Sequence, residues 1–203
     1  MERFDEIEAR RIKIVGDDGV VRMILTAPPT PDATLRGKPI VKQNRREASI
    51  LFYNDEGTEC GGLGFSGTTG PDGIVDATVH LAFDQYEQDE AISITFSQHG
   101  DQRGYGISMS DHPLTSISES LEEQQRVSTM QGGPEKEAAM RKIREQHPQR
   151  LFLGRRETGE ICLFMMDTKG RPRIRIAVGA DDVPKMEFLN ESGHVVYAVP
   201  PTL

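Results

Sequence analysis

A repeated hairpin unit constrains the fold of this chain more than any other feature. Each unit is a run of alternating apolar and polar residues, a polar four-residue turn that ends in glycine, and a second alternating run. The asparagine or aspartate that usually opens the turn accepts hydrogen bonds from the backbone ahead of it, and the glycine takes the positive φ of a type I turn with a bulge. We therefore predict positive φ at Gly57, Gly170 and Gly193. The turns occupy residues 16–19, 54–57, 97–100, 167–170 and 190–193.

The hairpins predict a mainly β fold, an antiparallel hairpin meander that forms a single domain over residues 1–203. Alternating runs at Val75–Phe83, Gly104–Ser110 and Arg150–Gly154 bring the total to about a dozen strands. The turn glycines are irregularly spaced, which excludes a propeller or solenoid of fixed period. A barrel, a sandwich and a large curved sheet all remain compatible with this pattern. We expect strand content to be more than about twice the helix content.

Residues 27–47 form a proline-rich, basic segment that interrupts the strand pattern. Asp32 and Glu47 oppose five basic residues there, so the segment carries +3 in a chain of net charge −8. Irregular connections of this length are uncommon unless they are functional or disordered. The segment is either a flexible loop or a contact for a partner or an anionic ligand. The candidate contact residues are Arg36, Lys38, Lys42, Arg45 and Arg46.

Residues 116–146 are predicted to form an inserted helical hairpin. Ser116 and Glu119 match a capping box at its start. Gly132 and Gly133 end the first helix, and Pro134 suits the first position of the second. The apolar stripes of both helices are thin, so the hairpin either covers a sheet edge or docks on another subunit.

Composition narrows the possible partners and the location. The 32 acidic residues outnumber the 24 basic ones, which disfavours nucleic acid and anionic lipid as partners. No apolar run reaches the roughly 18 to 20 residues that cross a bilayer, and the N-terminal residues lack the apolar stretch of a secretory signal. Cys60 and Cys162 are too few for a disulfide scaffold. We expect a cytoplasmic protein with two half-buried thiols.

Two motifs suggest enzyme chemistry, but the residues around them argue against it. Residues 62–67 read G-x-G-x-x-G, yet no helix can start in the Thr-Thr-Gly-Pro-Asp-Gly that follows, so a nucleotide phosphate would have no helix N-terminus to bind. These glycines are better explained by bulges or close strand packing. Ser66 lacks the second glycine and the strand-to-helix turn of a nucleophile elbow. We assign no catalytic residue.

We also predict no metal site and no cofactor. The five histidines are widely separated, and none has another histidine or cysteine at metal-ligand spacing, although the fold could bring His80 and His112 together. Residues 84–90 contain four carboxylates but lack the ligand spacing of a calcium loop. This segment is either a solvated hairpin connection or a contact for a divalent cation or a partner.

Three strands share a face of small hydroxyl side chains. Apolar residues alternate with Thr78 and His80, with Ser93 and Thr95, and with Ser108 and Ser110. If these strands are neighbours, this face is either the solvated outer face of a two-layer fold or a polar pocket or ordered interface. The candidate ligand-binding residues are His80, Ser93, Thr95 and Ser108.

Three longer strings resemble a group of uncharacterised bacterial proteins of about this length. They are Phe-Asp-Glu-Ile-Glu at 4–8, Phe-Tyr-Asn-Asp-Glu-Gly-Thr-Glu-Cys-Gly-Gly-Leu at 52–63, and Phe-Asp-Gln-Tyr-Glu-Gln-Asp at 83–89. The resemblance covers most of the chain and implies a bacterial, cytoplasmic origin. It implies no activity, cofactor or catalytic residue.

The function that these features favour is a non-catalytic binding or structural module that forms a homo-oligomer. Met165 and Met166 are adjacent in one strand and therefore point to opposite faces, so both are buried only if the strand is covered on both sides. The alternative is a small-molecule-binding or hydrolytic β-barrel whose site lies on the Ser/Thr/His-lined face.

Overall fold

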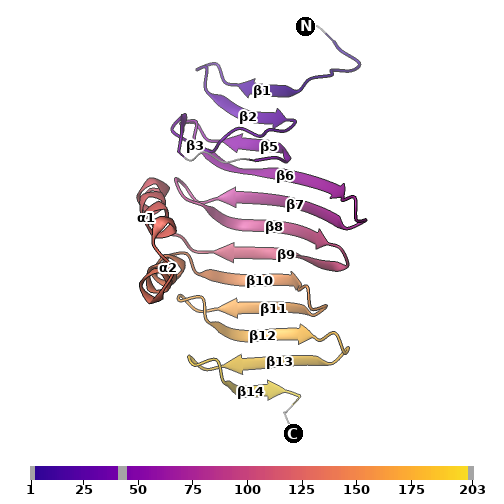
Figure 1. The fold of residues 1–203 in the computed structure, drawn as a ribbon, viewed down its shortest axis with the longest axis vertical. Coiled ribbons are helices and arrows are strands. Elements are labelled where there is room, and N and C mark those ends of the chain that lie inside the picture. Colours follow the sequence, from indigo (N-terminus) through magenta and orange to yellow (C-terminus); the bar gives the residue numbers. More distant parts are fainter. Residues whose placement is uncertain (1–2, 41–44, 201–203) are drawn as a thin grey trace.

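The computed structural model describes residues 3–40 and 45–200, which form one large antiparallel sheet (Figure 1). Its twelve strands follow one another across the sheet in chain order, apart from the small separate pair β3 (Thr34–Leu35) and β4 (Lys38–Pro39). The strands of the sheet are β1 (Arg11–Val15), β2 (Val21–Thr26), β5 (Ala48–Tyr53), β6 (Glu59–Thr69), β7 (Val75–Asp84), β8 (Glu90–His99), β9 (Gln102–Ser110), β10 (Gln149–Arg155), β11 (Ile161–Met166), β12 (Pro172–Val178), β13 (Pro184–Leu189) and β14 (Val195–Val199).

The predicted mainly β hairpin meander is confirmed, with 48% strand and 13% helix. The sheet is not closed, and its first and last strands, β1 and β14, do not meet. Of the three architectures that the sequence allowed, the chain therefore adopts the curved sheet. The barrel and the two-sheet sandwich are wrong for a single copy.

Hydrogen bonds within the turns explain the repeated hairpins. The side-chain Oδ1 of Asn54 accepts from the backbone N–H of Glu56 and of Thr58, each at 3.0 Å. Asp167 and Asn190 make the same pair of bonds in their own turns. Gly57, Gly170 and Gly193 have φ of 74°, 72° and 79°, as predicted. The 97–100 turn differs, because β8 continues to His99 and the reversal falls at residues 100–101.

The inserted hairpin consists of α1 (Ile117–Thr129) and α2 (Pro134–Gln146). Ser116 is the N-cap residue, but its hydroxyl accepts from Ser118 instead of capping a backbone N–H, so the predicted capping box is wrong. The hairpin lies beside the ends of the central strands and covers neither edge strand (Figure 1). The backbone N–H of Ile117 donates to the carbonyl of Glu87 at 2.7 Å, which ties α1 to the β7–β8 turn. Neither helix in the described ranges has the length and apolar content to span a membrane.

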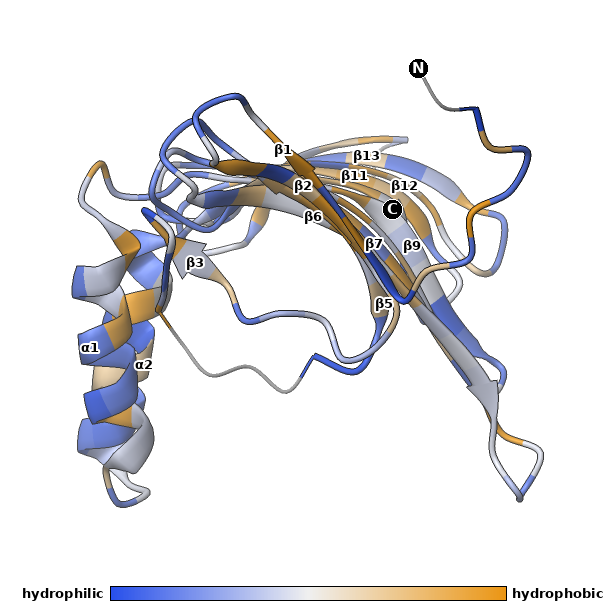
Figure 2. Cartoon of the chain, turned by 90° about the horizontal axis from the view of Figure 1, so that it is seen from above, coloured by the Kyte–Doolittle hydropathy of each residue, from blue (hydrophilic) through white to orange (hydrophobic). Residues whose placement is uncertain are grey.

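The first part of the 27–47 connection packs against the sheet near β2 and β5. The hydroxyl of Thr30 lies 2.9 Å from that of Ser49, and both residues are buried. Beside them Ile24, Leu51 and Tyr53 form a small buried apolar cluster. In Figure 2 the sheet curves over this connection, and the helices stand on the same side at one end of the curve. We call the side of the sheet that faces them the inner face.

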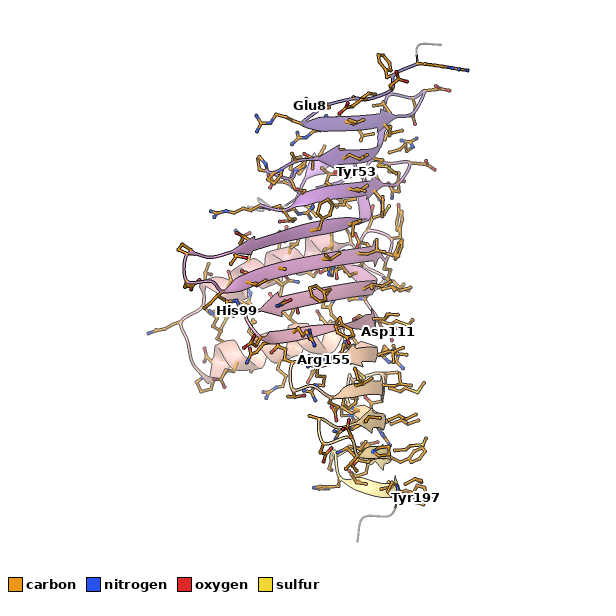
Figure 3. The ribbon with its side chains drawn as sticks, turned by 90° about the vertical axis from the view of Figure 1, so that its right-hand side faces the viewer. Glu8, Tyr53, His99, Asp111, Arg155 and Tyr197 are labelled. Carbon is orange, nitrogen blue, oxygen red and sulfur yellow. The ribbon has the colours of Figure 1, made fainter. Side chains whose placement is uncertain are left out.

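The other side, which we call the apolar face, carries rows of apolar side chains that cross the whole sheet. The central row has one aliphatic or Met side chain from every strand, each paired with the next by register, and Figure 3 shows such rows along the stacked strands. None of these side chains is buried, and six are 36% to 48% exposed. The row consists of Ile12, Leu25, Ile50, Leu63, Leu81, Ile94, Ile107, Leu153, Leu163, Ile176, Met186 and Val199.

Two mid-strand glycines allow a close approach between β9 and β10. Gly106 and Gly154 are directly paired, and a Cβ added to Gly154 would lie 2.1 Å from the carbonyl oxygen of Tyr105. The glycines of the G-x-G-x-x-G string likewise lie inside β6 with no helix after them, as the sequence predicted. A Cβ on Gly62 would lie 2.7 Å from the carbonyl oxygen of Ile50. Glycine at such positions serves strand packing.

Candidate functional site on the inner face

The inner face contains a cavity of about 1150 Å³. Its floor is formed by β5, β6 and β7, and its walls by residues 33–35, 40, 45 and 47 of the 27–47 connection, the β7–β8 turn and α1. Hairpin alternation places His80, Ala82 and Asp84 of β7 on the same side of the sheet, and all three line this cavity. The helix reaches it because α1 is anchored at Glu87.

The four predicted ligand-binding residues do share the inner face. His80 pairs with Thr95 across β7 and β8, and Ser93 pairs with Ser108 across β8 and β9. The ring Nδ1 of His80 lies 2.9 Å from the Thr95 hydroxyl, and its Nε2 lies 2.7 Å from Oε1 of Glu90. The ring is therefore held in one orientation at the cavity wall.

The same four residues do not converge on one hollow. His80 lines the large cavity, whereas Thr95 and Ser108 line a second hollow of about 370 Å³ that also contacts Phe152 and Arg155. Ser93 lines neither. Ligand binding by this set remains a prediction.

Two of the five basic residues of the 27–47 connection are paired with carboxylates. Nε of Arg36 donates to Oε1 of Glu87 at 2.6 Å, and Nη1 of Arg45 donates to Oε1 of Glu59 at 2.9 Å. Lys38 and Arg46 are exposed. Lys42 lies outside the described residues. Because Arg36 and Arg45 already have anionic partners within the chain, they offer less charge to an external anion than the sequence suggested.

Two carboxyl groups of the cavity have a raised pKa, and the shift is large at Asp84. Burial raises the pKa of Asp84 to about 7, with further contributions from Asp89, Glu59 and Glu90 and opposition from Arg45. Burial also raises the pKa of Glu59, although Arg45 opposes the shift. Burial in this end of β6 and β7 therefore disfavours the charged form of both carboxyl groups.

Two buried acceptor atoms at the cavity have no hydrogen-bond partner among the described residues. They are Oε2 of Glu59 and Oε1 of Gln88. The amide nitrogen of Gln88 donates to the carbonyl of Thr115 at 2.7 Å, which fixes the amide so that its oxygen is the free atom. Sequence reasoning did not single out Glu59, whereas Gln88 and Asp84 lie in the 84–90 segment that it considered as a possible contact for a divalent cation or a partner. The signal for Asp84 was alternation, since it lies four residues after His80 in the same strand.

Histidines far apart in sequence also meet near this site. Nε2 of His112 lies 2.8 Å from the carbonyl oxygen of Glu90, which can only accept, so this nitrogen carries the proton. In the neutral ring Nδ1 of His112 then accepts from Nδ1–H of His147 at 2.9 Å. His80 and His112 thus both contact Glu90, one through its side chain and one through its backbone.

The described residues contain no group of three or more His, Cys, Asp or Glu side chains arranged to hold a metal ion. Cys60 is half-buried, Cys162 is buried, and both are free thiols whose pKa is raised by burial. Comparison with protein-family models and with curated protein sequences finds no match.

Proposed function

We propose that this chain is a non-catalytic structural or binding module that associates with a second copy of itself through the apolar face. The observation that carries the proposal is the central apolar row, in which twelve side chains from twelve strands remain in contact with solvent. Exposed apolar patches of more than a few hundred Å² typically mark an interaction surface.

The size of this face suits a stable dimer. Twelve strands spaced by about 4.8 Å extend for about 53 Å, and three rows of side chains are about 18 Å wide. The product is about 950 Å² per copy, close to the roughly 800 Å² per partner of a standard protein interface. Flanking residues such as Phe83 and Met109 on one side, and Val79 and Tyr105 on the other, widen the strip.

The central apolar row favours a second copy of this chain as the molecule that covers the apolar face. A two-fold interface brings the same patch of both subunits together, so it requires a self-complementary surface. Ridges of aliphatic side chains of similar size meet that requirement, because two such sheets pack face to face at about 30° with interdigitated side chains. The dimer is then a sandwich whose two layers come from two chains. Met165 on the apolar face, 44% exposed in one copy, becomes buried in it.

Light scattering coupled to size-exclusion chromatography tests this proposal at micromolar concentration. The wild type should have at least the mass of a dimer. Replacing Ile94 and Leu153 together with lysine should give a monomer, because desolvating two ammonium groups in an apolar interface is costly. Both side chains are already 45% and 46% exposed, so the monomer should keep its circular dichroism spectrum.

Met140→Lys is the matched comparison, since Met140 is 40% exposed but lies on α2. It should leave the dimer intact. A monomeric wild type would refute the proposal. A dimer that survives the double lysine variant would place the contact elsewhere, on the helices if Met140→Lys dissociates it and on the open sheet edges if it does not.

A further inference from the structure

We propose that the inner-face cavity binds a small aliphatic amine with more than one ammonium group. This proposal is independent of self-association, because the cavity and the apolar face lie on opposite sides of the sheet. Three features of the cavity carry it: the sign of its charge, the chemistry of its unpartnered atoms, and the spread of its carboxylates.

The lining of the cavity is strongly acidic. It contains six carboxylate side chains and, among lysines and arginines, only Arg45 in the described part of the chain. Arg45 is already paired with Glu59, and Glu87 is paired with Arg36. A concave site of one charge sign raises the local concentration of counter-ions. The six residues are Glu47, Glu59, Asp84, Glu87, Asp89 and Glu90.

The unpartnered atoms are acceptors, so the ligand must supply donors. Gln88 is only 5% exposed, and its Oε1 has no donor in the ranges that the structure describes. Oε2 of Glu59 is likewise buried without a hydrogen-bond donor among the described residues. An ammonium group has three N–H donors and no acceptor, which matches two buried oxygens beside a surplus of carboxylates. Burial is the main cause of the raised pKa of Asp84, and the neighbouring carboxylates of Asp89, Glu59 and Glu90 raise it further.

The arrangement of the carboxylates favours an amine over a metal ion as the ligand. A calcium ion needs six to eight oxygens within about 2.6 Å, and the described residues contain no cluster suited to a metal. Several ammonium groups on one alkyl chain can instead reach separated carboxylates. The methylene groups between them have apolar contacts available, because Leu51, Ile117 and Leu121 also line the cavity.

Isothermal titration calorimetry with spermidine tests this inference on the full chain. We expect one spermidine per chain, and Asp84→Asn should weaken its binding at least fivefold. Glu135→Gln is the control, because it removes one negative charge from the exposed surface of α2, away from the cavity, and should change the affinity less than twofold. Asp84→Asn is nearly isosteric, and a thermal melt checks that the variant is folded.

Proton release gives a second readout. A bound cation should displace the proton of Asp84 near pH 7, so the measured heat should depend on the ionisation enthalpy of the buffer in the wild type and much less in Asp84→Asn. Absence of binding, or equal weakening by Glu135→Gln and Asp84→Asn, would overturn the proposal and indicate only non-specific attraction. Saturable binding of calcium chloride that is tighter than spermidine and competes with it would assign the site to a metal ion instead.

Discussion

Replacing Asp84 with asparagine measures the free energy of ionising a carboxyl group that is buried in the inner-face cavity. Burial and the neighbouring carboxylates raise the pKa of Asp84 in the folded protein from 3.8 to about 7. Between about pH 4 and pH 7 the folded chain therefore keeps a proton that the unfolded chain has released. The stability that this proton contributes is complete below the unfolded pKa and is lost as the pH rises through the folded pKa.

The magnitude follows from the size of the shift. A change from 3.8 to about 7 is about 3.2 pH units, and each unit corresponds to about 1.4 kcal/mol. The free energy of unfolding of Asp84→Asn, relative to the wild type, should thus increase by about 4 kcal/mol in total from about pH 4 to about pH 8. The slope of that difference should approach about 1.4 kcal/mol per pH unit in the middle of the range.

Urea unfolding followed by circular dichroism at constant ionic strength is a suitable assay. The difference between variant and wild type isolates Asp84, because titrations of other groups affect both proteins in nearly the same way. Asp76→Asn, an exposed carboxylate at the other end of β7, controls for the change in net charge. A difference that stays constant with pH for Asp84→Asn would refute the reasoning, since it would mean that the cavity does not hold this proton.

Three further changes test the sheet and the absence of a structural metal. Gly154→Ala should lower the free energy of unfolding by about 1 to 3 kcal/mol, because its Cβ would lie 2.1 Å from a backbone oxygen. Gly67→Ala is the control and should be nearly neutral, since its Cβ would make only an ordinary 3.6 Å contact. Urea unfolding measures both variants. Gly170→Val should cost roughly 1 to 2 kcal/mol in the same assay through strain at φ 72°. EDTA should leave the thermal midpoint unchanged, and a drop that one cation restores would contradict this.

The hairpins could be predicted from the sequence because their determinants are local. Asn54 and Gly57 lie in the same four-residue turn, and the side chain and the positive φ that close it depend on nothing distant. Alternation then placed His80 and Thr95 on one face once their strands were paired. The two inserted helices were predictable for the same reason, since Pro134 and the glycines before it act within one turn.

The candidate site was only partly predictable, because its chemistry depends on burial. The segment from Asp84 to Glu90 has the composition of a solvated turn. It becomes a cavity wall because α1 is anchored to Glu87, so that burial raises the pKa of Asp84. The ion-pair partners of Arg36 and Arg45 could not be predicted from the sequence either, since Glu87 lies 51 residues from Arg36 along the chain. The prediction of basic residues free to contact an anion did not include these pairs.

The sequence by itself determined most of the hairpins and, for strands that pair, which side chains share a face. These follow from turn chemistry and from a side-chain period of two, which act over a few residues. Only the tertiary structure decided that the sheet stays open, because closure depends on the twist and tilt summed over twelve strands. The open sheet leaves the central apolar row uncovered on one side, and on the other side α1, the β7–β8 turn and described residues of the 27–47 connection form the walls of the acidic cavity.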